Sequence, residues 1–222
     1  MLDTAWWSTV WRAQLPVRGL ATAATLEFRD SIMSVFRDEP LVQMGVRNSI
    51  LELVQGDITT QLVDAVVNAA NRQLSGGGGV DGAIHAAAGP AVMRETAERY
   101  PSGCPTGSAV ITTAGKLRAS YVIHAVGPVW QGGEQQEPLL LASAYYRCFE
   151  LAVQHRCDSI AFPAISTGAY NYPLEDAAAV AVDATLQFLT DHDRPHLVRF
   201  VLFDATAYET YERVLRKAVS SR

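Results

Sequence analysis

Four polar side chains between residues 68 and 85 are of the types that could carry out chemistry together: Asn68, Asn71, Asp81 and His85. Asp81 and His85 lie four residues apart, so on a helix both would project from the same face. Between the asparagines and this pair is a run of four glycines, residues 76–79. Glycine backbone can adopt φ > 0 and approach a ligand without interference from Cβ, and exposed amides at such a turn suit phosphate. The pattern predicts an anion-binding loop flanked by an acid and an imidazole.

Each of these residues also has a purely structural explanation. The glycines could form a flexible surface loop, and Asp81 could be a carboxylate favoured by the dipole at a helix start. His85 could be a histidine packed in the core. The combination of all of them beside two asparagines at a strand end favours a ligand site.

A second loop, ISTGAY at residues 165–170, has similar properties. It follows an apolar strand-like segment and precedes a helix that begins near Pro173, so it could present amides and hydroxyls to another phosphate. Two such loops in one domain suggest a diphosphate held between them, although an ordinary strand-to-helix connection is the alternative. Neither loop matches the motifs of triphosphate hydrolases or dinucleotide dehydrogenases, so both classes are disfavoured.

The elements that would position these loops alternate between strands and helices. Apolar segments at 49–55, 64–71, 108–115, 120–128, 158–165 and 197–203 predict strands, and helical segments separate several of them. This order predicts an α/β layered domain with a mainly parallel sheet, in which ligands bind outside the carboxyl ends of the strands. Both loops and the segment Phe203-Asp204 fall at such ends. Asp57 could accept a hydrogen bond from an amino-purine or cap a turn.

Charge and cysteine content restrict the kinds of partner and site that this chain is expected to have. The formal net charge is −5, and residues 1–48 contain five basic and five acidic groups, so the excess of acid lies in residues 49–222. An acidic domain disfavours nucleic acid as a partner. The three cysteines have no CxxC or metal-ligand spacing, which argues against a disulfide framework or a metal site and fits a reducing cytoplasm. No window reaches the roughly 18 apolar residues needed to span a membrane.

The pattern of apolar residues divides the chain into two parts. Residues 1–43 have some apolar periodicity but lack the features of a secretory signal, and they are predicted to be an N-terminal extension, weakly ordered or accessory. Residues 44–222 are predicted to form the single domain that contains both loops.

Several segments together resemble the macrodomain family, and in particular its MacroD-type ADP-ribosyl hydrolases and O-acetyl-ADP-ribose deacetylases. These segments are GDIT at 56–59, VVNAAN at 66–71, GGGGVDGAIHAAAG at 76–89, TGSAVIT at 106–112, YVIHAVGPVW at 121–130 and FPAISTGAYNYP at 162–173. They occur in colinear order across nearly all of residues 45–220. The resemblance implies a three-layer α/β/α sandwich around a mixed, mostly parallel sheet.

The resemblance also implies a role for each site residue. Asp81 would be the catalytic acid/base, supported by His85, and Asn71 would orient the distal ribose of ADP-ribose. The two loops would wrap the diphosphate, Tyr170 would cover the distal ribose, and Phe203 would stack on adenine beside Asp57. The full implied ligand-binding set is Asp57, Ile58, Asn68, Gly77, Gly78, Gly79, Val80, Ser166, Thr167, Gly168, Ala169, Tyr170 and Phe203. Asn171 stands where many relatives have glycine, and because asparagine tolerates left-handed backbone angles, we expect the loop to keep its shape.

The activity implied is hydrolysis of esters on the distal ribose, either the acetyl ester of O-acetyl-ADP-ribose or the ester that links ADP-ribose to an acidic protein side chain. Neither a metal nor a cofactor is expected, and the lack of a G-x-S-x-G motif argues against an acyl-enzyme. The expected partners are therefore ADP-ribose, its esters and mono-ADP-ribosylated proteins. The main alternative is a non-catalytic ADP-ribose reader, which would need the phosphate loops but not Asp81. An RNA-associated regulator is disfavoured by the acidic charge.

Overall fold

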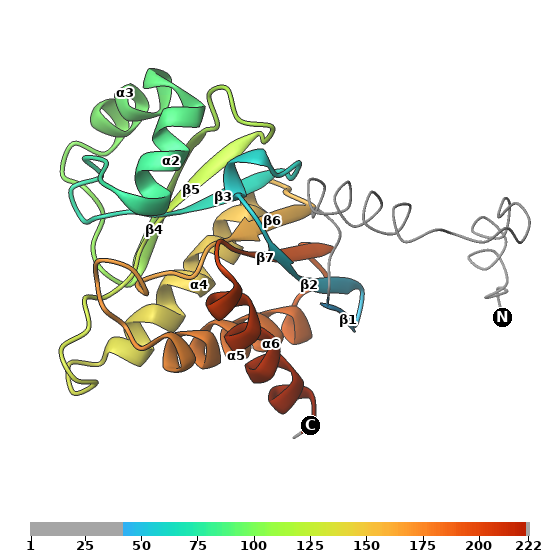
Figure 1. Ribbon diagram of the computed structural model, residues 1–222. Helices are drawn as coiled ribbons and strands as arrows, with labels where there is room; N and C mark the ends of the chain where they lie inside the picture. The colour runs from blue at the N-terminus through green and yellow to red at the C-terminus, as the bar shows by residue number, and fades with distance from the viewer. Residues whose placement is uncertain (1–41, 221–222) are drawn as a thin grey trace, which may run out of the picture. The chain divides into compact units, whose positions relative to one another are not determined.

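A computed structural model describes residues 42–220 of this chain (Figure 1). Its strands are β1 (Val42–Val46), β2 (Ser49–Gln55), β3 (Ala65–Ala69), β4 (Ser108–Thr113), β5 (Tyr121–Val126), β6 (Ser159–Phe162) and β7 (Leu197–Leu202). Its helices are the short 3-10 helix η1 (Ile58–Thr60), α2 (Gly79–Ala88), α3 (Pro90–Arg99), α4 (Glu137–Gln154), α5 (Leu174–Asp191) and α6 (Ala205–Ser220).

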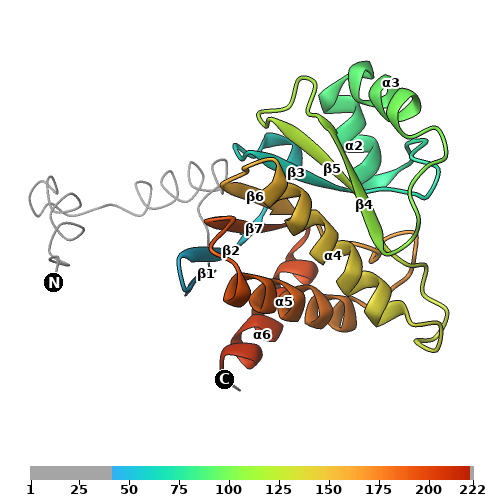
Figure 2. The same ribbon diagram turned by 180° about the vertical axis from the view of Figure 1, so that it is seen from behind.

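The strands form one seven-stranded sheet in the order β1-β2-β7-β6-β3-β5-β4. The five central strands run parallel to one another, while β1 and β4 pair antiparallel at the two edges. Helices α2 and α3 cover one face of the sheet, and α4, α5 and α6 cover the other (Figures 1 and 2). The predicted three-layer α/β/α sandwich with a mixed, mostly parallel sheet is confirmed.

Side chains of the central strands alternate between the two faces of the sheet and so contribute to a hydrophobic core on each face. In β3, Val67 points into the large cluster beneath α4, α5 and α6, whereas Val66 points into the smaller cluster beneath α2. Because successive side chains of a strand point to opposite faces, a strand covered on both faces must be apolar throughout. Residues at even positions of β3 and β5, including Asn68 and His124, therefore face α2.

Two elements differ from the sequence prediction. Strand β1 was not anticipated, and it crosses the expected domain boundary between residues 43 and 44. Its burial alternates because it is an edge strand, and its hairpin to β2 turns at Arg47, which has φ of +50° without the glycine that usually announces such a turn. Strand β6 ends at Phe162, three residues earlier than predicted, because the chain turns there into the second loop.

The predicted N-terminal extension falls almost entirely outside the described residues. Among residues 42–220, none of the helices combines the length and the apolar character that a membrane crossing requires.

Candidate functional site

A cleft of about 330 Å3 opens at the carboxyl ends of β3, β5 and β6, where the parallel sheet predicts a ligand site. It brings the two predicted loops together. Its lining residues are Ala69, Ala70, Asn71, Gly77, Gly78, Gly79, Val80, Asp81, Gly127, Ala164, Ile165, Ser166, Gly168, Ala169 and Tyr170.

The glycine loop leads directly into the N-terminus of α2 at the cleft. Gly78 is the N-cap residue and provides no side chain to cap the first turn, and Gly79 has φ of +59°. The backbone N–H groups of a first helical turn have no partner within the helix, and the helix dipole favours an anion there. The loop also needs glycine for packing, since a Cβ at Gly82 would lie 2.7 Å from the carbonyl oxygen of Gly77.

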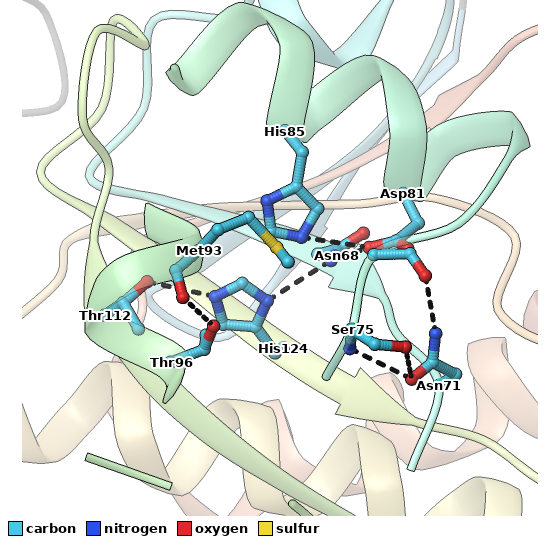
Figure 3. A network of polar contacts seen from close by, with 10 residues as sticks. Asn68, Asn71, Ser75, Asp81, His85, Met93, Thr96, Thr112 and His124 are labelled. Atoms are coloured by element: carbon cyan, nitrogen blue, oxygen red, sulfur yellow. Dashed lines mark hydrogen bonds and ion pairs between the residues drawn. The ribbon is translucent and has the colours of Figure 1, made fainter. Parts of the chain in front are cut away.

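Asn71 closes the glycine loop on itself. Its Nδ2 donates to the carbonyl oxygen of Gly76 over 2.8 Å, and its Oδ1 accepts from the backbone N of Ser75 over 3.2 Å and from the Ser75 hydroxyl over 3.3 Å. Figure 3 shows this side chain turned toward the loop. Asn71 also lines the cleft, so it both borders a ligand and fixes the loop that would hold one.

Asp81 lies in the first turn of α2 and is 5% exposed, with its carboxylate held from behind (Figure 3). Asn68 Nδ2 donates to Oδ1 over 2.6 Å, and His85 Nε2 lies 3.3 Å from the same oxygen. The second oxygen, Oδ2, lies against the glycine loop, 3.1 Å from the point where a Cβ on Gly77 would sit. One carboxylate oxygen is therefore engaged by the protein, and the other faces the loop.

The pKa of Asp81 reflects a balance in which hydrogen bonding prevails. Burial alone would raise the pKa of this carboxyl, but hydrogen bonds from His85 and Asn68 stabilise the ionised form and outweigh that effect. The net result is a pKa below the ordinary value, so Asp81 is a carboxylate at neutral pH.

Behind Asn68 lies a histidine that the sequence interpretation did not single out. His124 of β5 is the register partner of Asn68 in β3, and its Nδ1 lies 3.2 Å from Asn68 Nδ2. Its Nε2 lies 3.0 Å from the hydroxyl of Thr112 in β4. Burial of the ring, together with the nearby His85, lowers the pKa of His124 to about 4. The sequence signal was present as a polar residue inside the otherwise apolar segment YVIHAV.

The second loop is held in a strained shape against the end of β5. Ser166 has φ of +68° and is buried, and its hydroxyl oxygen makes no hydrogen bond to any of residues 42–220. A Cβ at Gly127 would lie 2.2 Å from this oxygen, so glycine is required there. Sequence reasoning missed Gly127, whose only signal was a glycine directly after a strand. As expected, Asn171 adopts a left-handed conformation, with φ of +53°.

The predicted adenine-binding residues are not in the lining of the cleft. Asp57 Oδ1 accepts from the backbone N and the hydroxyl of Thr59, each over 2.8 Å, so the carboxylate does cap a turn. Ile58 is buried in the small core together with Ile84. Phe203 follows β7 and is 82% exposed. Strand pairing places the ends of β2 and β7 side by side, because Gln55 is the register partner of Leu202, so Asp57 and Phe203 lie at neighbouring strand ends.

Two other predicted ligand residues also lie outside the lining. Asn68 is 0% exposed and sits behind Asp81, and the Thr167 hydroxyl donates to the carbonyl oxygen of Ala164 over 3.0 Å within its own loop. No group of three or more His, Cys, Asp or Glu side chains among residues 42–220 is arranged to hold a metal ion.

The sequence of this chain matches a known family. The family model described as Macro domain matches residues 67–181. The chain is 51% identical over 170 residues to an O-acetyl-ADP-ribose deacetylase of Citrobacter rodentium, a match that covers 76% of this chain and 96% of the relative. A macro domain-containing protein of Methanosarcina mazei is 48% identical over 181 residues, covering 82% and 96%.

Solved structures of macrodomains are also similar to this chain. The Oceanobacillus iheyensis macrodomain with ADP is 40% identical, with a TM-score of 0.77 and coverage of 82% of this chain and 97% of that one. The Trypanosoma brucei macrodomain in complex with ADP-ribose is 41% identical, with a TM-score of 0.69 and coverage of 73% and 68%. Since sequence model, relatives and fold all agree over the part of the chain that builds the cleft, this chain belongs to the macrodomain family.

Proposed function

We propose that this protein binds ADP-ribose in the cleft and hydrolyses esters on its distal ribose. The observation that carries the proposal is the carboxylate of Asp81, which is ionised, anchored through one oxygen and directed by the other toward a glycine loop at a helix N-terminus. A module that only bound the diphosphate would need the backbone amides but not a carboxylate held in this way. Relatives named O-acetyl-ADP-ribose deacetylase, each more than 50% identical, support the same reaction.

The Oceanobacillus iheyensis macrodomain supports the choice of residues. Solved structures of that protein carry single substitutions at an asparagine, at a glycine seven positions later and at an aspartate three positions after that. Asn71, Gly78 and Asp81 have the same spacing in this chain.

Asp81 would act on a water molecule held between its Oδ2 and the ester. The water oxygen attacks the carbonyl carbon as a proton passes to the carboxylate, and the bond between that carbon and the ribose oxygen then breaks. The proton returns from Asp81 to the ribose oxygen, which gives ADP-ribose and a carboxylic acid. His85 supports Asp81 through Oδ1, and Asn71 orients the ribose through the glycine loop that it closes.

The remaining site roles are part of the same proposal. The amides at Gly77–Val80 and those of Ser166–Ala169 grip the diphosphate, and Tyr170 borders the distal ribose. Because Asp57 uses Oδ1 to cap its turn, we assign Oδ2 to the adenine amino group, with the exposed ring of Phe203 stacking on the base.

The substrates proposed are O-acetyl-ADP-ribose and proteins that carry mono-ADP-ribose on aspartate or glutamate. The acidic charge of the domain disfavours nucleic acid. A cytoplasmic location fits the three buried free cysteines, whose pKa values are raised by burial so that the thiols stay protonated and poorly reactive.

The test compares wild type, Asp81→Ala and Asp81→Asn in turnover of O-acetyl-ADP-ribose and of a glutamate-linked ADP-ribosylated protein, with ADP-ribose affinity measured on all three. We expect turnover to fall by about 100-fold or more in both variants, while ADP-ribose binding is retained. If wild type binds ADP-ribose but turns over neither substrate, the protein is a reader and the catalytic assignments are wrong.

A further inference from the structure

A chain of buried polar side chains runs behind Asp81 across three adjacent strands (Figure 3). It consists of Asn68 in β3, His124 in β5 and Thr112 in β4, which are 0%, 1% and 1% exposed. All three face α2. Polar groups buried this deeply in a sheet weaken the fold unless they are hydrogen-bonded. Each of these three side chains makes at least one such bond, and Asn68 Oδ1 is the one buried polar atom of the three without a partner among residues 42–220.

The directions of these hydrogen bonds are fixed by their partners. The Thr112 hydroxyl donates to the carbonyl oxygen of Thr113 over 3.1 Å, so it accepts from His124 Nε2. Nε2 therefore carries the imidazole hydrogen, and Nδ1 is a bare acceptor that faces the amide nitrogen of Asn68. The other hydrogen of that amide goes to Asp81 Oδ1. If the Asn68 amide were flipped, its oxygen would face two acceptors.

The charged and titratable groups around His124 leave this arrangement in place at neutral pH. The ring of His85 stacks over that of His124 with centroids 5.8 Å apart, and Asp81 and Glu95 are the acidic groups that act on it. Burial and the neighbouring His85 together lower the pKa of His124 to about 4, so the ring stays neutral. A protonated ring would have a hydrogen on Nδ1 and would lose its bond with Asn68.

We propose that His124 is a positioning residue for the hydrolysis, holding the Asn68 amide in the orientation that anchors Asp81, and that Thr112 selects the tautomer that allows it. This inference rests on the proposed function, because it assigns these residues to the reaction that Asp81 carries out. None of the three touches the cleft: they act on the ligand only through Asp81.

Thr112→Val is the main test, because it removes the acceptor of His124 Nε2 without changing the shape or β-branching of the side chain. The imidazole is then free to place its hydrogen on Nδ1, where it repels the Asn68 amide. We expect kcat to fall by about tenfold or more, while KM and the Kd for ADP-ribose stay within about twofold of wild type. Thr112→Ser keeps the hydroxyl and should restore kcat.

Thr113→Val is the matched control. It removes the same chemical group from the next residue of β4, which is exposed and whose hydroxyl donates to Glu95 and not to His124. We expect its kcat to match that of wild type.

Nitrogen NMR of the histidine side chains gives a readout that does not depend on activity. In wild type, His124 should show a protonated Nε2 and a bare Nδ1 at every pH from 5 to 8, whereas Thr112→Val should show a mixture of tautomers. Should Thr112→Val fail to fold, His124→Asn and His124→Leu replace it, because asparagine keeps an acceptor near the place of Nδ1 and leucine does not. His124→Asn should then retain more kcat than His124→Leu.

The results separate this inference from the function on which it rests. A wild-type kcat in Thr112→Val with a disturbed tautomer would overturn the positioning role of His124. A loss of kcat accompanied by an equal loss in KM and in ADP-ribose affinity would also overturn it, because such a loss indicates a structural role only. The same holds for a loss of kcat that Thr112→Ser does not restore. A wild-type rate in Asp81→Ala would instead refute the proposed function, whatever the tautomer of His124.

Discussion

Gly127 offers a sharp test of how the cleft is built, because it lines the cleft where the second loop packs against the end of β5. In the structure, a Cβ on this residue would lie 2.2 Å from the hydroxyl oxygen of Ser166 and 2.7 Å from Cγ2 of Ile165. Real contacts are never this short, so Gly127→Ala forces the second loop to move. Ser166 already holds a left-handed φ of +68°, and Ile165 is fully buried, which leaves little room for adjustment.

The size of the effect follows from the cost of overpacking, about 1–3 kcal/mol. For a domain of this size, 1 kcal/mol lowers Tm by roughly 2–4 °C, so Gly127→Ala should melt several degrees below wild type. If the displaced loop forfeits a similar free energy in phosphate contacts, the Kd for ADP-ribose should rise about tenfold. Thermal melts and calorimetric titration with ADP-ribose measure both.

Gly45→Ala is the matched control, since a Cβ at this position of β1 meets nothing within 4 Å. It should leave both Tm and Kd near the wild-type values. Wild-type stability and affinity in Gly127→Ala would refute the reasoning, because they would mean that the second loop is not held against β5.

Three further predictions rest on separate contacts. Asn71→Ala removes the side chain that ties the glycine loop to the Gly76 carbonyl, so ADP-ribose affinity, measured by calorimetry, should fall along with kcat. In the folded protein His124 stays neutral down to about pH 4, whereas in the unfolded chain it takes a proton near pH 6.5. Acid therefore favours the unfolded chain, and the free energy of unfolding should fall by about 2 kcal/mol between pH 6.5 and pH 5. Urea unfolding of His124→Asn should lack this part of the pH dependence. Arg199 forms an ion pair with the buried Glu52, so Arg199→Met should lower the free energy of unfolding by about 3 kcal/mol, and Glu52→Leu in the same chain should recover much of that loss.

The sequence was informative where local chemistry and backbone pattern coincide. Glycines 76–79 between an apolar strand and a small-residue helix could be interpreted without a structure, because few other arrangements need four glycines followed by Asp81. The sheet could be predicted for a similar reason, since strands buried on both faces must be apolar throughout.

What the sequence could not supply was contact between residues distant in the chain. His124 and Asn68 are separated by 56 positions and meet only because β3 and β5 pair in that register. Gly127 matters because Ser166 lies against it, and nothing near Gly127 in the sequence indicates that neighbour. The location of Asn68 behind Asp81, and not on the cleft wall, likewise depends on which face of β3 the helix α2 covers.

The low pKa of Asp81 bears on how the proposed reaction would work. A carboxylate stabilised by hydrogen bonds from His85 and Asn68 is a weak proton acceptor, so it gains less from basicity than a carboxylate with a pKa near neutrality would. Its contribution must come largely from orientation, which explains why a buried network holds one oxygen and leaves the other directed at the glycine loop.

The lowered pKa values of Asp81 and His124 predict the pH profile of the reaction. A group whose pKa lies below its ordinary value remains ionised well below neutral pH, and His124 remains neutral to about pH 4. We therefore expect kcat for O-acetyl-ADP-ribose to stay constant within about twofold from pH 7.5 down to pH 5, in steady-state assays corrected for uncatalysed ester hydrolysis. A fall in kcat with a midpoint between pH 6 and pH 7 would contradict this expectation, because neither the lowered pKa of Asp81 nor that of His124 lies in this range, and another titrating group would then control the rate.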